Sequence, residues 1–168
     1  RPQLLLLNAL LGGGCSSRLF QELREKRGLC YTVYSYVSDH ADAGFLGVYA
    51  ALNREQEGQA LDAMRALVCD LADHGPTQEE LERAREQSKA NVVMGLESTQ
   101  SRMSHAGRSL LFSGEILTPE QIIAAYDSVT HEDVVALAQE IFRWDQVSLS
   151  AVGQVRTAEA YRALVLEA

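Results

Sequence analysis

The sequence of 168 residues lacks a long hydrophobic run, an excess of positive charge and any paired-cysteine motif. No apolar stretch approaches the roughly 20 residues that a membrane-spanning helix needs. The net charge of −8 argues against a general nucleic-acid binder, which needs a basic face to meet phosphates. The same charge argues against an anionic membrane surface. We therefore expect neither nucleic acid nor a membrane among the partners.

Metal-binding motifs are also missing from the sequence. Three cysteines without CxxC spacing, Cys15, Cys30 and Cys69, fit a reducing compartment and offer no zinc site. The four histidines are scattered, and none stands in an HExxH or HxxEH motif. We expect no metal site in this chain. The charge and the cysteines favour a bacterial cytoplasmic protein, with the mitochondrial matrix as the alternative.

What the chain does contain is an ordinary globular composition. It is 46% hydrophobic and 23% charged, which is enough to bury a core and too apolar for a disordered chain. We find no internal repeat, low-complexity tract or linker. Residues 1–168 are therefore expected to form a single domain. Because the chain opens directly on an apolar helical run, we expect it to be a piece of a longer protein.

Periodicity, caps and glycine stops predict a mixed architecture. Helices are expected over residues 2–11, 18–27, 54–72, 78–111 with a break near 95–98, 119–126, 130–141 and 157–167. Strands are expected over residues 31–37, 44–52 and 147–152. This order indicates an α+β fold with a small antiparallel or mixed sheet and helices packed on one face. Three strands are few for so much helix, so a first strand upstream of residue 1 is expected to be missing.

The stretch from Gly12 to Tyr31, GGGCSSRLFQELREKRGLCY, organises the chain. Its glycines are predicted to end the first helix in a tight turn, and Gly28 to end the short helix that follows. This loop–helix–strand unit is expected to bring Arg24 and Tyr31 near one another. Taken alone, Arg24 fits a solvated helix edge and Tyr31 fits a packing residue at the start of a strand.

This stretch and the following DAGFLGVYAAL resemble the C-terminal domain of the pitrilysin/insulinase-type zinc metallopeptidases. The bacterial processing proteases and mitochondrial processing peptidases are the most similar branch. The resemblance continues through residues 80–142 and the segment VSLSAVG, and so covers nearly the whole chain. It implies the LuxS/processing-peptidase-like half-domain fold, with a strand before the first helix that is not present here.

The resemblance also implies a function. In that family a homologous N-terminal half carries zinc on an HxxEH motif, and the C-terminal half carries an arginine and a tyrosine in R-x6-Y spacing. Arg24 and Tyr31 match this spacing, which implies that they are the catalytic and substrate-binding residues of this chain. Zinc is expected only in the complete enzyme, on a domain absent here, so the chain alone is expected to be inactive.

The implied partners are a peptide or unfolded polypeptide substrate and the zinc-binding half, as a domain or as a subunit of a homo- or heterodimer. The chain departs from its relatives at Cys15 and Cys30, where they often have Met and Ala, and neither change removes a donor. The alternative function is a non-catalytic scaffold or core subunit of the same family. A peptide-binding module without hydrolysis is a third, weaker reading.

Overall fold

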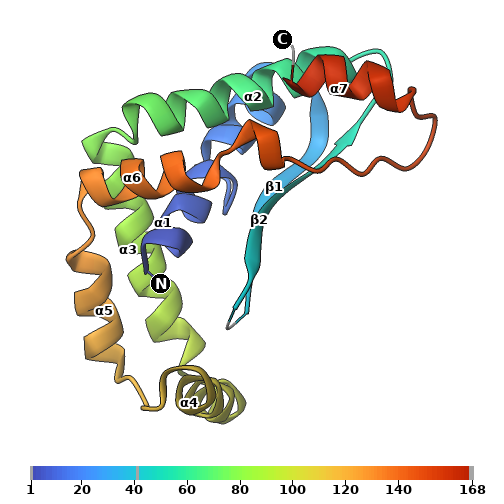
Figure 1. The fold of residues 1–168 in the computed structure, drawn as a ribbon. Helices are drawn as coiled ribbons and strands as arrows, with labels where there is room; N and C mark the ends of the chain where they lie inside the picture. The colour runs from blue at the N-terminus through green and yellow to red at the C-terminus, as the bar shows by residue number, and fades with distance from the viewer. Residues whose placement is uncertain (1, 41, 167–168) are drawn as a thin grey trace.

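The computed structural model describes residues 2–40 and 42–166. In chain order these form α1 (Pro2–Leu11), the π-helix η1 (Phe20–Lys26), β1 (Cys30–Asp39), β2 (Gly44–Leu52), α2 (Glu57–His74), α3 (Gln78–Gly95), α4 (Thr99–Ser113), α5 (Pro119–Asp127), α6 (His131–Ile141), the 3₁₀-helix η2 (Trp144–Gln146) and α7 (Ala158–Leu166). Helices around one hairpin make this an α+β fold, as the sequence predicts (Figure 1).

The core is built around α1. This helix is apolar nearly all round, so it can be stable only when neighbours cover it on several sides. It lies between α3 and the hairpin and also contacts α5 and α6 (Figure 1). Its side chains Leu6, Leu7, Leu10 and Leu11 are buried. Burying each leucine stabilises the fold by about 1.5–3 kcal/mol, so these four side chains contribute strongly to the core.

Strands β1 and β2 form a two-stranded antiparallel sheet, in which Tyr34 pairs with Tyr49 and Ser38 with Phe45. Because side chains alternate along a strand, one face turns toward α1 and the other away from it. Val33 and Ser35 are buried on the face toward α1. The sequence prediction of an antiparallel hairpin with helices on one face is therefore confirmed.

The helix boundaries follow the caps in the sequence. Thr77, Thr118 and Thr130 each accept a hydrogen bond from the backbone N–H three residues later, and each forms a capping box with the side chain at that position. The long helix expected over residues 78–111 is broken after Gly95, and Ser98 caps α4. The predicted break between 95 and 98 is confirmed.

One sequence prediction of local structure is wrong. Residues 147–152 form no strand but an exposed extended segment, because no neighbouring strand in the described part of the chain supplies ladder hydrogen bonds. The short helix expected over 18–27 is confirmed over residues 18–26, and most of it, Phe20–Lys26, is a π-helix. The last helix ends at Leu166, and Glu167 lies outside the described residues. Within those residues, no helix is both long and apolar enough to cross a bilayer.

Candidate functional site: the Arg24–Tyr31 pair

Arg24 lies on the π-helix η1. The Arg27 N–H donates to the Glu22 carbonyl oxygen over 3.2 Å, a bond that spans five residues instead of four. Leu19 and Leu23 are fully buried and hold one side of this segment against the core. A π-helix widens the backbone locally and is frequent at functional sites. Arg24 follows the buried Leu23 and is thereby held at the edge of the surface.

Tyr31 lies at a backbone irregularity near the start of β1. The β1–β2 register shifts between Cys30 and Thr32, so that Tyr31 is the extra residue of a β-bulge. Cys30 packs against the core, whereas the Tyr31 side chain is 80% exposed. A bulge redirects a side chain away from the regular alternation of the strand. The tyrosine expected to pack at the start of a strand therefore projects into solvent.

The structure brings the two predicted site residues together. The Arg24 guanidinium carbon lies 5.0 Å from the centre of the Tyr31 ring and 4.7 Å from the centre of the Phe20 ring. An arginine over aromatic faces is held by cation–π attraction, worth about 0.5–1 kcal/mol at an exposed site. The rings thus orient the planar donor fork without occupying its N–H groups.

The polar atoms of this pair remain available. Within the described residues, neither the Arg24 guanidinium nor the Tyr31 hydroxyl has a hydrogen bond to protein. The nearest carboxylate oxygen, on Glu25, is 3.8 Å from Arg24 Nε. Glu22 is occupied by Lys26 and Arg27 at 3.1 and 2.8 Å, and these bonds lower the pKa of its carboxyl. The pair can therefore donate hydrogen bonds to a carbonyl or an oxyanion.

The site has no nucleophile or metal ligand set of its own. Burial raises the pKa of the Cys30 thiol, and the nearby Arg24 charge opposes that effect only in part. A thiol with a raised pKa is a poor nucleophile at neutral pH. No group of three or more His, Cys, Asp or Glu side chains that could hold a metal occurs within residues 2–40 and 42–166. The side chains described here do not form a zinc site.

Arg18 fixes the loop that carries the site, a role that the sequence analysis missed. Its guanidinium makes a bidentate pair with Glu80 at 2.9 and 2.8 Å, and it donates to Asp70 Oδ2 and to the Gly75 carbonyl. Only 12% of the Arg18 side chain is exposed. Its partners lie 52 to 62 residues away in sequence, so no local pattern could have identified them.

The glycine loop before η1 ends the first helix, as predicted. The Gly12 N–H donates to the Asn8 carbonyl at 3.0 Å, which ends α1. The Gly12 carbonyl accepts from the Ser35 N–H at 3.1 Å, and a Cβ at Gly12 would lie 2.3 Å from that nitrogen. Only glycine allows this approach of the loop to β1. The loop therefore sets the position of η1 relative to the strand.

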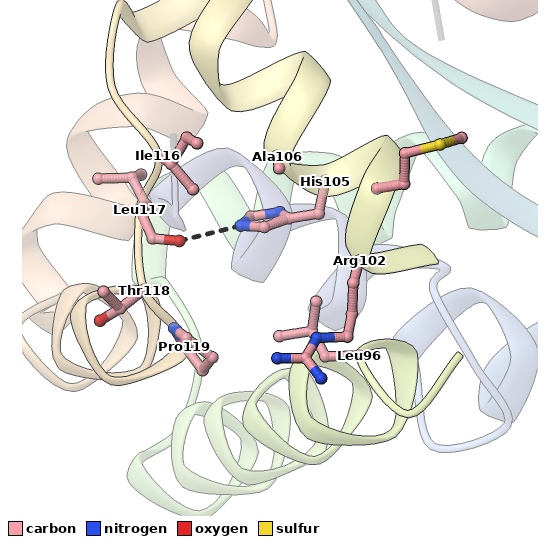
Figure 2. Close-up of a pocket in the computed structure, with 9 residues that line it drawn as sticks. Leu96, Arg102, His105, Ala106, Ile116, Leu117, Thr118 and Pro119 are labelled. Carbon is pink, nitrogen blue, oxygen red and sulfur yellow. Dashed lines mark hydrogen bonds between the residues drawn. The ribbon is translucent and has the colours of Figure 1, made fainter. Parts of the chain in front are cut away.

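A separate hollow lies in the corner between the end of α3, α4 and the start of α5 (Figure 2). It has a volume of about 630 Å³ and a largely apolar lining. His105 Nε2 lies 3.1 Å from the Leu117 carbonyl oxygen, which can only accept, so this nitrogen donates. Neither Arg24 nor Tyr31 lines this hollow, and it is not part of the candidate site.

Comparisons with known proteins identify the family of the chain. Residues 1–88 match the family model described as peptidase M16 inactive domain. A protein named as an uncharacterized zinc protease of Streptomyces coelicolor is 43% identical over 157 residues, which cover 94% of this chain and 34% of the relative. The uncharacterized zinc protease YmxG of Bacillus subtilis is 40% identical over 142 residues, which cover 84% and 35%.

Among solved structures, a peptidase M16 inactive domain from Pseudomonas fluorescens is similar, with a TM-score of 0.75 and 26% identity. The match covers 84% of this chain and 34% of that chain. A protease from Helicobacter pylori gives a TM-score of 0.69 at 25% identity, over 85% and 35% of the two chains. The chain thus spans about a third of the length of the curated relatives it matches.

Proposed function

Because the chain belongs to the peptidase M16 family as its inactive domain, we propose that it is the substrate-binding and oxyanion-stabilising half of a zinc metalloendopeptidase. The observation that carries this proposal is the Arg24–Tyr31 pair, with the guanidinium 5.0 Å from the phenol ring. The Tyr31 side chain is exposed and Arg24 is half-buried, and both carry donors that bond to no described protein group. The substrates are peptides or unfolded polypeptides, whose backbone carbonyls are the acceptors that these donors fit.

Each side chain has a distinct task in this proposal. The Tyr31 hydroxyl donates a hydrogen bond to the oxygen on which charge develops as the peptide carbonyl is attacked. Removing such a donor lowers kcat by about 10²–10³. Arg24 holds a neighbouring substrate carbonyl with its planar fork, and the Phe20 and Tyr31 rings keep that fork in one orientation.

The nucleophile comes from outside this chain. A zinc-bearing half with an HxxEH motif supplies it, either as another domain of the same polypeptide or as a partner subunit in a homo- or heterodimer. The residues of this chain bind and orient the substrate. In the absence of that half the chain is inactive, because donors alone do not activate water.

The experiment replaces Tyr31 by Phe in the complete enzyme. We expect kcat for a peptide substrate to fall by about 10²–10³, because the ring stays in place while the hydroxyl is lost. Zinc content, measured by elemental analysis, should not change. Arg24→Lys should lower kcat/KM, because an ammonium group cannot reproduce the planar fork.

Arg108→Lys is the matched control for Arg24→Lys. Arg108 also lies over an aromatic ring, that of Phe112 at 6.0 Å, but it belongs to α4 and not to the site. Its substitution should leave turnover unchanged. Wild-type turnover in the Tyr31→Phe enzyme would remove Tyr31 from the mechanism.

A further inference from the structure

The outer face of the hairpin, which turns away from α1, carries no charged residue. The eight positions on this face by register are Thr32, Tyr34, Tyr36, Ser38, Phe45, Gly47, Tyr49 and Ala51. The solvent face of an antiparallel sheet is ordinarily polar, and exposed sheet edges ordinarily carry charges. Because the chain has a net charge of −8, the lack of any charged residue on this face distinguishes it from an ordinary solvent-exposed sheet face.

Four aromatic side chains form a continuous row on this face, and we call Tyr34, Tyr36, Phe45 and Tyr49 the aromatic strip. Tyr34 and Tyr49 stack with ring centres 5.1 Å apart. Tyr36 lies 6.1 Å from Tyr34 and meets Phe45 edge to face at 5.8 Å. Each of the four is between 42% and 57% exposed.

Gly47 is what allows the strip to be continuous. Tyr36 pairs with Gly47 across the strands, and a Cβ at Gly47 would lie 2.7 Å from the Tyr36 ring. Glycine weakens a strand interior and often marks a close approach of another group. Here that group is the Tyr36 ring, which lies across β2 and reaches Phe45. The absence of a side chain at Gly47 thus leaves room for the Tyr36 ring to lie against the sheet.

The two faces of the hairpin differ in the kind of contact they suit. The inner face contributes aliphatic side chains such as Val33, Leu46 and Ala50 to a permanent core. The aromatic strip is mostly tyrosine, which combines a rigid apolar ring with a hydroxyl that stays hydrated. Tyrosine is enriched at recognition surfaces that bind and release partners. A reversible ligand with apolar side chains fits the outer face better than a permanent cover does.

The strip lies on the same strand as part of the candidate site, because β1 carries Tyr31 as well as Tyr34 and Tyr36. At a rise of about 3.3 Å per residue these rings lie roughly 10 and 17 Å along the strand from Tyr31. An extended peptide advances by the same rise per residue. A peptide held at Tyr31 and lying along β1 would therefore place side chains three to five residues further on over the strip.

We propose that the aromatic strip is a binding site for apolar and aromatic side chains of an extended peptide, three to five residues from the bond held at Arg24 and Tyr31. This inference rests on the proposed function and extends it, because it names a class of substrate. The preferred substrates carry an aromatic residue at that distance. Since the strip has no charge, its contribution to binding is insensitive to salt, unlike a contribution from Arg24.

The test measures binding by this chain, without turnover. Fluorescently labelled decapeptides with either Phe or Ser at a single position are titrated and followed by anisotropy. Tyr34→Thr and Tyr49→Thr remove a ring and keep strand propensity. We expect each to weaken binding of the Phe peptide about three- to ten-fold, as loss of one aromatic contact does, and to leave the Ser peptide unchanged. Phe112→Ala, an exposed ring on α4, is the control.

A second measurement needs no substitution. Addition of the Phe peptide to the unmodified chain should shift the NMR signals of the Tyr34 and Tyr49 amides more than those of α4. Equal affinity for the Phe and Ser peptides, or no shift on the strip, would overturn this inference. Neither result would contradict the proposed function, which the Tyr31→Phe turnover experiment tests separately.

The remaining outcome is a different occupant of the strip. If Tyr34→Thr and Tyr49→Thr leave peptide binding intact but prevent association of the chain with its zinc-bearing half, the strip is an interface between the two halves. That result would also overturn the inference. Association is measured by analytical ultracentrifugation of the separately expressed halves.

Discussion

Arg18 and Glu80 show how much of the site depends on residues that never meet a substrate. Their bidentate pair joins the loop before η1 to the first turn of α3, where the Glu80 side chain also accepts from the Thr77 N–H at 2.7 Å. The hydrogen bonds from Arg18, and then those from Thr77, lower the pKa of the Glu80 carboxyl below its ordinary 4.5. This pair is therefore a stabilising contact with a defined pH dependence.

Glu80→Gln should lower the free energy of unfolding by about 1.5–3 kcal/mol at pH 7, the usual loss for hydrogen bonds to a charged group. The folded carboxyl has a lowered pKa, so its contribution is complete above pH 4.5 and is lost as the pH falls through the folded value. Urea unfolding at a series of pH values should show a shallower acid decline in Glu80→Gln than in wild type.

Glu79→Gln is the control for this experiment. Glu79 precedes Glu80 on the same helix turn, but its side chain is 88% exposed and it pairs with Arg83 only at 3.5 Å. Its substitution should change the unfolding free energy by less than about 0.5 kcal/mol. A loss equal to that of Glu80→Gln would mean that the Arg18 pair contributes nothing specific.

At the same scale, the sequence was informative about Arg24 and Tyr31 and silent about Arg18. The loop–helix–strand unit predicted that the first two lie together, and they do; the catalytic role that the R-x6-Y resemblance implies stays a prediction. The backbone irregularities that present them, a π-helix and a β-bulge, leave no periodic signal. The partners of Arg18 are distant in sequence, and long-range pairing is not encoded in any local pattern.

Among the elements, the contact between the α1 end and β1 sets the orientation of the site. Gly12→Ala should destabilise the fold by about 1–3 kcal/mol, the usual range for overpacking, because the new Cβ would lie 2.3 Å from the Ser35 nitrogen. Gly14→Ala in the same loop is the matched control, since nothing lies within 4 Å of its Cβ position. Thermal unfolding of both variants checks this; equal midpoints would contradict it.

The elements also show where pattern reading ends. Helices with strong caps were predicted almost to the residue, because Thr77, Thr118 and Thr130 satisfy local N–H groups whatever the rest of the chain does. Residues 147–152 have the alternation of a strand, but a strand also needs a neighbour with free N–H and C=O groups. Whether a neighbouring strand is present depends on the whole fold, so the alternation of residues 147–152 alone could not predict it.

At the scale of the whole molecule, α4 is held less firmly than the rest. It stands off the end of α3 in Figure 1, and none of its described side chains is buried. The hollow of about 630 Å³ beside it further reduces its packing. By contrast α1 is surrounded on several sides. The two helices therefore differ in how much of the structure must open to expose them.

The consequence concerns amide protons. In deuterated buffer the amides of α4 should exchange at least tenfold faster than those of α1, because α4 can fray alone whereas α1 is released only when the core comes apart. Mass spectrometry of peptides from a timed exchange series measures this difference. Equal protection of the two helices would mean that α4 melts only together with the core.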